Sequence, residues 1–436
     1  MENKRITVFE YSKLVVDNIN FREKHFNALV RYNEINGNKY FTVGYRKVTF
    51  KSYVGVIQVG NLIIEILPKA DNTAVNDTNA VNKWQLALPY MLKVAGFVNF
   101  NKAGTASQAT RQMHLLDIFL YDFLEKVDKL IHSGLIKKYR RVQTNNMALK
   151  GRLLLPQHIR HNIIHKERFY TEHTVYDRDN AFNQILKKAL EIVSSTSRNY
   201  TIQGLAKKHL IYFNNIKSIK PDKGSFKKLK YDSKTNEYKE AIELAKMIIL
   251  EYSPDFTLGQ EDILTILFDM NKLFEVFIYK LLKKEERYFS EYSLHVNKQT
   301  SRAFWRGKTI RPDVIINYQV KKSKEGKAEI NRVVLDTKWK VLRDGLPSDA
   351  DLKQMFTYNI QFGATHSILF YPATGSANLG KELFERSVSF EDFEHCCEAY
   401  FADLFKSELE INESLAKEFV QYILPKKQIG NIESMA

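Results

Sequence analysis

Cysteine is almost absent from the sequence. The 436 residues include two cysteines, and these two, Cys396 and Cys397, are neighbours. Adjacent cysteines can supply neither a disulfide framework nor a four-ligand zinc site. We therefore expect reduced thiols, which are typical of the cytoplasm.

Long apolar runs are missing as well. The first residues, Met1 to Arg5, are not followed by an apolar core of signal-peptide length. No segment approaches the roughly 20 apolar residues that a membrane-spanning helix needs. These absences predict a soluble cytoplasmic protein with no membrane partner.

A third absence is the phosphate-binding loop Gly-x-x-x-x-Gly-Lys-Ser/Thr. The glycines Gly151, Gly204, Gly224 and Gly259 all stand outside that spacing. Because this loop cradles the phosphates of a bound nucleotide in P-loop enzymes, we do not expect the chain to hydrolyse ATP or GTP in that way.

The sequence does contain a large hydrophobic fraction and an excess of positive charge. Hydrophobic residues make up 44% of the chain and aromatic residues 12%, which is typical of a folded protein. A length of 436 residues predicts two to three domains. Lysine and arginine outnumber aspartate and glutamate by 66 to 50, a formal net charge of +16. This surplus favours a polyanionic partner such as nucleic acid.

Hydrophobic patterns predict a multidomain α+β fold. In residues 1–83, short β-branched and aromatic runs are punctuated by glycine, and Gly60-Asn61 suits a tight hairpin turn. This part predicts a β-rich N-terminal domain that ends in a small polar linker around residues 71–80. From Trp84 the apolar spacing becomes helical, so residues 84–255 predict a mainly helical region.

The third part, residues 256–436, mixes helices and strands. A helix is predicted from about Asp262 to Lys284, and it is followed by strands, by a helix over residues 348–362 and by another strand. This order predicts a C-terminal α/β domain. Beyond Lys381 the sequence becomes acidic, and we interpret that segment as a C-terminal tail.

Positive charge gathers in the middle region. Two segments carry much of it: Gly134–Arg152, which contains no acid, and Lys207–Lys230, whose single acid is Asp222. Such segments suit contacts with the phosphates of nucleic acid. The candidate contacts in the first segment are Lys137, Lys138, Arg140, Arg141, Lys150 and Arg152.

Two further patterns each allow two interpretations. His158, His161 and His165 have the spacing of one helical face, which suits a metal cluster, but the basic residues around them favour a phosphate-facing or solvated surface. Trp305 stands between two arginines and either stacks on a nucleobase or closes the end of a strand.

The strongest chemical signal is a pair of acids with a lysine. Asp313 follows Pro312 and precedes an apolar run, while Asp336 and Lys338 interrupt a second apolar strand. The two-residue period of a strand places Asp336, Lys338 and Lys340 on one face. Charges on an otherwise buried strand are unfavourable unless they are paired or functional.

This arrangement suits the hydrolysis of a phosphodiester. Mg²⁺ prefers oxygen ligands, which Asp313 and Asp336 can supply. Lys338 can orient or deprotonate the attacking water and neutralise charge on the phosphate oxygens. The alternative interpretation is a structural ion pair between Asp336 and Lys338, with Asp313 in a turn.

These residues resemble a known motif. Pro312-Asp313 with Asp336-Thr337-Lys338 resembles the PD-(D/E)xK nuclease motif, and Gln354 to Tyr358 resembles the QxxxY helix that accompanies it. The flanking sequence is similar to the McrC family, the nuclease subunits of McrBC modification-dependent restriction systems. The matching stretches are Thr7–Tyr11, Val59–Lys69, Lys150–Arg152, Asp179–Ala189 and Asp269–Glu275.

The resemblance implies an αβββαβ core like that of restriction endonucleases. Asp313, Asp336 and the backbone carbonyl of Thr337 would bind Mg²⁺, and Lys338 would be the catalytic lysine. Glu275 is either a further metal-binding acid or the polar edge of an amphipathic helix. Supporting roles fall to Gln354, Tyr358 and Lys340, with core packing as the alternative for Tyr358.

The resemblance also implies how the protein would work. It would be the Mg²⁺-dependent endonuclease subunit of a complex that cleaves double-stranded DNA containing methylcytosine. A separate AAA+ GTPase hexamer, McrB, would bind GTP and read the modified base. Residues 1–83 would either dock onto it and stimulate GTP hydrolysis or form a small β-domain that only packs on the rest of the chain. The alternatives are a RecB-like exonuclease of DNA repair and a non-catalytic DNA-binding adaptor that activates a motor protein.

Overall fold

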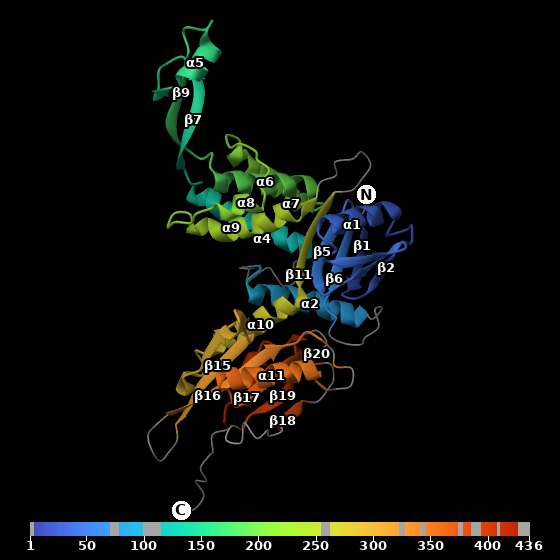
Figure 1. The fold of residues 1–436 in the computed structure, drawn as a ribbon. Coiled ribbons are helices and arrows are strands. Elements are labelled where there is room, and N and C mark those ends of the chain that lie inside the picture. Colours follow the sequence, from blue (N-terminus) through green and yellow to red (C-terminus); the bar gives the residue numbers. More distant parts are fainter. Residues whose placement is uncertain are drawn as a thin grey trace, which may run out of the picture.

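The chain forms three parts that share one continuous apolar core (Figure 1). The structure, a computed structural model, describes residues 4–69, 78–98, 115–253, 262–321, 328–340, 342, 346–373, 378–384, 394–407 and 410–425. The linker predicted around residues 71–80 lies largely outside the described residues.

The N-terminal part is built on a five-stranded sheet of order β1-β6-β5-β11-β10. Strands β5 and β6 form the predicted hairpin, in which Val59 pairs with Leu62 across the Gly60-Asn61 turn. Strand β1 is parallel to β6, and β11 is antiparallel to β5. The bounds are β1 Lys4–Phe9, β5 Tyr53–Val59, β6 Leu62–Leu67, β10 Tyr252–Ser253 and β11 Ile263–Asp269.

Strand β11 corrects the prediction of a helix from Asp262 to Lys284. Residues Ile263 to Phe268 are rich in β-branched and apolar side chains, and they complete the first sheet beside β5. Helix α10, Met270–Glu285, begins only afterwards, where the carboxylate of Asp269 accepts a hydrogen bond of 3.1 Å from the amide of Asn271. The part predicted to begin at residue 256 therefore contributes a strand to the first sheet.

A second layer covers the outer face of this sheet. It consists of the small sheet β2-β4-β3 and of helix α1. The sequence patterns did not reveal α1. The apolar side chains of this layer form a core of their own with Ile57 and Ile64 of the first sheet. The bounds are β2 Lys13–Val15, α1 Glu23–Ile35, β3 Phe41–Gly44 and β4 Lys47–Phe50.

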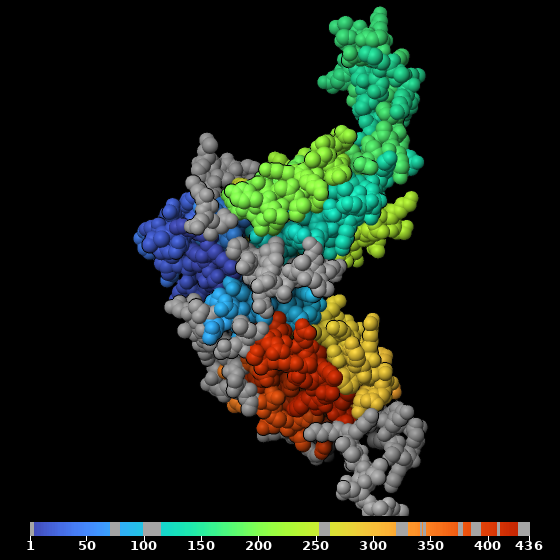
Figure 2. Space-filling model, turned by 180° about the vertical axis from the view of Figure 1, so that it is seen from behind, coloured from blue at the N-terminus to red at the C-terminus, as the bar shows by residue number. Residues whose placement is uncertain are grey.

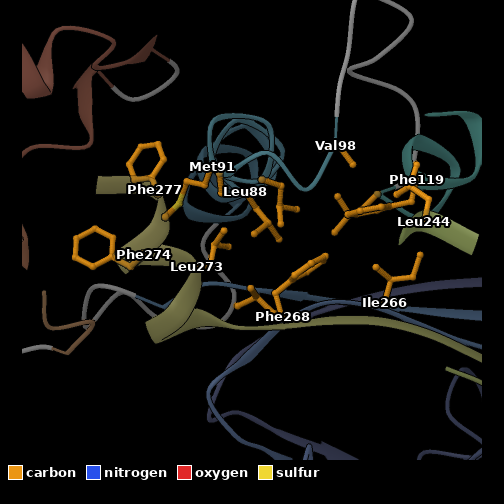
Figure 3. Close-up of a cluster of buried hydrophobic side chains, with 14 of the residues drawn as sticks. Leu88, Met91, Val98, Phe119, Leu244, Ile266, Phe268, Leu273, Phe274 and Phe277 are labelled. Carbon is orange, nitrogen blue, oxygen red and sulfur yellow. The ribbon is translucent and has the colours of Figure 1, made fainter. Parts of the chain in front are cut away.

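Helices that come mostly from the middle region fill the inner side of the first sheet. Figure 3 shows Ile266 and Phe268 of β11 facing Leu88 and Met91 of one helix and Phe119 of another. In the part of the chain that the structure describes, no helix is both long and apolar enough to cross a membrane. The bounds are α2 Thr78–Ala95, α4 Leu115–Ser133, α6 Ala181–Thr196, α7 Tyr200–Leu210, η1 Ile211–Phe213, α8 Lys223–Lys227, η2 Asn236–Tyr238 and α9 Lys239–Leu250.

A long arm projects from the helices, and it corrects the expectation that the basic segment Gly134–Arg152 belongs to a helical region (Figure 2). Strands β7 and β9 pair along their whole length. Tyr139, Val142 and Thr144 of β7 are residue types that favour strands. Gly151, with a φ of +78°, is required because a Cβ there would collide with the Glu172 carbonyl. The bounds are β7 Lys138–Asn146, β8 Arg152–Leu153, α5 Leu155–Asn162 and β9 Phe169–Asp177.

The C-terminal part is a six-stranded sheet of order β12-β15-β16-β17-β19-β18. Helices α10 and α12 pack on one face of this sheet and α11 on the other. The chain order is α10, β12, β15, β16, α11 and β17, with the hairpin β13–β14 inserted after β12. The bounds are η3 Ser290–Tyr292, β12 His295–Lys298, β13 Arg302–Trp305, β14 Lys308–Ile310, β15 Val314–Lys321, β16 Ala328–Thr337, α11 Asp349–Phe362, β17 His366–Pro372, β18 Leu379–Leu383, β19 Cys396–Ala402, β20 Phe405–Ser407, β21 Glu410–Ile411 and α12 Leu415–Ile423.

The segment beyond Lys381 is more than the predicted tail. Strand β19 lies between β17 and β18 in the sheet, and Phe419 of α12 is fully buried. Acidic composition concealed this role because alternate apolar residues, such as Ala399 and Phe401, are the ones that face the core.

Candidate functional site

The two predicted acids meet at one end of the C-terminal sheet. In the antiparallel register of β15 and β16, Val314 pairs with Leu335, so Asp313 lies opposite Asp336. Oδ2 of Asp313 accepts hydrogen bonds from the backbone nitrogen and the hydroxyl of Thr337, at 2.8 and 2.7 Å. Strand pairing therefore brings together acids that are separated by more than 20 positions in the sequence.

Lys338 joins this pair, as predicted. Its Nζ lies 2.6 Å from Oδ2 of Asp336 and 3.3 Å from Oδ1 of Asp351. Burial lowers the pKa of Lys338, but the negative charges of Asp336 and Asp351 outweigh burial, and the pKa is raised overall. The side chain is therefore an ammonium ion at neutral pH, which suits orientation and charge neutralisation better than proton abstraction.

Asp336 is buried beside a second negative charge. Its exposed fraction is 4%. Burial, followed by the charge of Asp313, raises the pKa of Asp336 to about 6 even though Lys338 is adjacent. A divalent cation between the two carboxylates would relieve this repulsion, and carboxylate and carbonyl oxygens are the donors that Mg²⁺ prefers. The donor set of Asp313, Asp336 and the Thr337 carbonyl therefore fits the predicted ion.

Glu275 of α10 lies near Asp313. Its Oε1 accepts a hydrogen bond of 2.5 Å from Nε2 of Gln299 and lies 3.7 Å from Nζ of Lys298. Burial and the nearby charge of Asp313 raise the pKa of Glu275. Among the described residues no three histidine, cysteine or acidic side chains already converge as a metal cluster. The side chain of Glu275 is thus near the site but engaged with other partners.

Helix α11 holds the lysine through a chain of hydrogen bonds. Nζ of Lys338 donates to Oε1 of Gln354 at 2.9 Å, and Nε2 of Gln354 donates to the hydroxyl of Tyr358 at 2.8 Å. That hydroxyl in turn donates to the carbonyl of Arg311 at 3.0 Å. Tyr358 is only 5% exposed, so its ring packs in the core while its hydroxyl holds the site through these hydrogen bonds.

Asp351 is a residue of the site that sequence reasoning missed. It binds Lys338 and also Lys340, for which a supporting role was predicted, and it accepts a hydrogen bond of 2.6 Å from Ser348. Burial alone would raise the pKa of Asp351, but the hydrogen bonds from Lys340 and Ser348 lower it to about 2. A signal was available, because Asp351 precedes Gln354 by three residues on one helical face.

The six residues predicted to contact the phosphates of nucleic acid lie away from the acid pair. Lys137 directly precedes β7 and the other five lie in the arm, which projects from the helices away from the C-terminal sheet (Figures 1 and 2). Arg140 is bound to Asp177 by hydrogen bonds of 3.0 and 2.8 Å, and Lys138 lies 4.8 Å from the ring of Phe182. The exposed members of the set are Lys137, Arg141, Lys150 and Arg152.

The three histidines of the arm do not converge. Nδ1 of His158 accepts a hydrogen bond from the amide of Tyr170 at 3.3 Å, and His161 stacks on the Tyr170 ring at 5.0 Å. His165 lies 3.3 Å from Glu167. These contacts support the interpretation of a surface rather than a metal cluster.

The geometry defines a multidomain α+β protein with a buried acid–lysine site at the end of a mixed sheet. A family model described as "McrBC 5-methylcytosine restriction system component" matches residues 48–372, which is most of the chain. The chain therefore belongs to the McrBC family of 5-methylcytosine restriction system components.

Two solved structures match this chain, and the one with the higher TM-score shows the same fold. One, described as a refined half-complex from a tetradecameric assembly of Thermococcus gammatolerans McrB AAA+ hexamers with bound McrC, contains a chain with a TM-score of 0.66 and 21% identity. The match covers 96% of this chain and 100% of that chain. The cryo-EM structure of the Thermococcus gammatolerans McrBC complex gives a TM-score of 0.47 and 22% identity, over 64% of this chain and 88% of that one. No curated protein matches the sequence.

Proposed function

We propose that this chain is the Mg²⁺-dependent DNA endonuclease subunit of an McrBC-like restriction complex, which cleaves DNA containing methylcytosine together with an AAA+ GTPase partner. The observation that carries the proposal is the placement of Asp313, Asp336 and Lys338 at one sheet end. The lack of a phosphate-binding loop in the sequence supports the nuclease role over the motor role. The similar fold in an assembly of McrB hexamers with McrC supports such a partner.

Each residue of the site has a place in this chemistry. Mg²⁺ held by Asp313, Asp336 and the Thr337 carbonyl would supply a Lewis acid and activate water when bound. The Lys338 ammonium donates to a phosphate oxygen or to the attacking water and offsets the growing negative charge. Gln354 and Asp351 hold that ammonium in position. Glu275 remains a candidate for a further metal-binding acid.

Two surfaces are candidates for the partner. The first is the predicted docking domain, residues 1–83. The second is the tip of the arm, where apolar side chains such as Met147 and Ile164 are 77% and 83% exposed. Exposed apolar side chains that gather at one place favour a protein partner, whereas the exposed lysines and arginines along the arm favour DNA phosphates.

The proposal is tested with a methylated circular plasmid, GTP, Mg²⁺ and the AAA+ GTPase encoded beside this chain. Asp336→Asn is expected to lower cleavage at least about a hundredfold and to leave assembly with the GTPase unchanged. Asp349→Asn is the matched control, because this exposed acid lies in the first turn of α11 without binding Lys338. Equal cleavage by wild type and Asp336→Asn would refute the site.

The alternatives give different results. A RecB-like exonuclease would degrade linear DNA but leave a covalently closed circle intact. A non-catalytic adaptor would show no Mg²⁺ binding that depends on the acid pair, so calorimetry would give the same titration for wild type and Asp313→Asn. The endonuclease predicts a cut circle and a loss of Mg²⁺ binding in that variant.

A further inference from the structure

The hairpin β13–β14 is a basic and aromatic element without an assigned role. From residue 299 to residue 312 the sequence contains no acid and four basic residues. Trp305 pairs with Lys308 across a two-residue turn of Arg306 and Gly307, whose φ angles are +40° and +78°. Such a tight turn presents the side chains of the two short strands to their surroundings.

The aromatic rings of this hairpin are exposed. Trp305 is 63% exposed and Phe304 50%, whereas the other two tryptophans, Trp84 and Trp339, are 2% and 5% exposed. The Arg306 guanidinium lies 5.2 Å from the centre of the Trp305 ring, which orients both side chains. An exposed tryptophan beside arginines is the combination that binds the bases and phosphates of nucleic acid.

The base of the hairpin is anchored to α11. Arg302 donates a hydrogen bond to the carbonyl of Gln361, and its guanidinium lies 5.0 Å from the ring of Phe362. At the other end of the hairpin, the hydroxyl of Tyr358 donates a hydrogen bond to the carbonyl of Arg311. The hairpin is thus held in place by the helix that positions Lys338.

A cavity of about 650 Å³ lies between the hairpin and α11. Phe304 and Arg311 line it on the hairpin side, and Gln354, Thr357 and Tyr358 on the helix side. Gln354 is the residue that binds the Nζ of Lys338. The cavity is therefore next to the proposed cleavage site, and its volume is within the range of small-molecule sites, which suits a nucleotide.

We propose that the β13–β14 hairpin is a nucleobase-binding element that stacks on a base beside the scissile phosphodiester. Phe304 supplies a ring face inside the cavity, and Trp305 supplies an exposed ring next to the turn of the hairpin. Arg306, Lys308 and Arg311 supply positive charge for the backbone. This inference rests on the proposed function, since it names the DNA contact of the same site. A base must leave its stack to meet an aromatic side chain, so the element acts on distorted or unpaired DNA.

Tryptophan fluorescence provides a test that does not depend on cleavage. The full chain is titrated in EDTA with a duplex oligonucleotide that contains a short single-stranded gap and with the intact duplex. Because Trp305 is the exposed tryptophan, base stacking is expected to quench its emission, more strongly with the gapped duplex. Trp305→Phe should lose the quenching and retain most of the affinity, measured by the anisotropy of labelled DNA.

Removal of the ring gives the second readout. Trp305→Ala is expected to weaken binding of the gapped duplex about tenfold or more, with an unchanged melting temperature because the side chain is exposed. Tyr45→Ala, at a residue of the N-terminal part that is 90% exposed, is the control for loss of a surface ring. Quenching that persists in Trp305→Phe, or unchanged affinity in Trp305→Ala, overturns the proposal.

The outcomes separate this inference from the proposed function. Cleavage that depends on Asp336 together with unchanged affinity in Trp305→Ala leaves the nuclease standing and refutes the role of the hairpin. Quenching at Trp305 together with cleavage that does not depend on Asp336 supports the hairpin and refutes the catalytic site. A wild-type chain that binds neither duplex refutes the hairpin's role and leaves the nuclease to be decided by the cleavage test.

Discussion

The indole nitrogen of Trp339 donates a hydrogen bond of 2.6 Å to the carboxylate of Glu10, 329 residues earlier in the chain. Glu10 follows strand β1 of the first sheet, and Trp339 follows Lys338 of the proposed catalytic site. The ring of Trp339 also packs edge-on against Trp84 and Phe274, at 5.7 and 5.1 Å. One side chain thus connects the N-terminal sheet, a middle helix and the site.

The buried carboxyl of Glu10 predicts a pH dependence of stability. Burial raises the pKa of Glu10 from 4.5 to about 7, against the hydrogen bonds from Lys69 and Trp339 that lower it. Because the folded state binds this proton more tightly than the unfolded state does, the free energy of unfolding falls as pH rises from 4.5 to 7. Glu10→Gln removes this loss, which is roughly 3 kcal/mol.

Urea unfolding of wild type and Glu10→Gln at pH 5 and pH 8 checks the predicted pH dependence of stability. The variant should match wild type at pH 5, where Glu10 is protonated, and should be the more stable protein at pH 8. Glu34→Gln, at an exposed glutamate of α1, is the control that should follow wild type at both values. The same pH dependence in wild type and Glu10→Gln would show that Glu10 ionises normally in the folded state.

Trp339→Phe should slow cleavage without weakening DNA binding. The substitution removes the donor to Glu10 next to Lys338 and leaves the ring packing largely intact. We expect cleavage about tenfold slower, a change of about 1.4 kcal/mol in the barrier. Trp84→Phe is the matched control, because its buried Nε1 has no hydrogen-bond partner among the described residues. Equal rates in the two variants would argue against a role for the hydrogen bond.

Tyr358→Phe should destabilise the chain by about 1 kcal/mol and reduce cleavage. Its hydroxyl accepts a hydrogen bond from Gln354 and donates one to the Arg311 carbonyl. Without the hydroxyl, Gln354 is held less firmly and positions Lys338 less well. Tyr371→Phe is the control within the same core, because that buried hydroxyl has no partner among the residues described. Thermal unfolding and cleavage assays measure both, and a Tyr371→Phe variant as impaired as Tyr358→Phe would contradict the prediction.

Exposed and ion-paired basic residues of the arm should differ in their contribution to the salt dependence of DNA binding. The double variant Arg141→Ala with Lys150→Ala removes exposed charges and should make the salt dependence of DNA binding shallower by about 2 in the log–log slope. Arg140→Ala should leave the slope unchanged, because its guanidinium is already bound to Asp177 and lies 3.3 Å from Asp179. Filter binding at several salt concentrations compares them, and equal slopes for wild type and the double variant would exclude the arm as a DNA contact.

Local patterns predicted the local parts of this fold. The hairpin of β5 and β6 follows from β-branched runs around Gly60-Asn61, and the placement of Asp336 next to Lys338 follows from the period of a strand. Helical spacing likewise predicted α11 close to its observed bounds. In each case the signal lies within about 20 consecutive residues.

Features that depend on distant partners escaped prediction. Strand β11 exists because β5, some 200 residues earlier, offers an edge to pair with, and β7 exists because β9 pairs with it. Asp351 becomes part of the site only when α11 packs beside β16, which brings it to Lys338. Short-range periodicity carries no information about such encounters.

The direct passage from β11 into α10 has a consequence for how such proteins evolve and can be engineered. The C-terminal part cannot be exchanged as a cassette at the apparent boundary near residue 256, because the exchange would carry away β11, which pairs with β5 in the N-terminal sheet. The recipient would be left with unpaired strand edges, which promote aggregation. A functional chimera therefore requires a crossover after Asp269, with the donor helix matched to the apolar surface of α2.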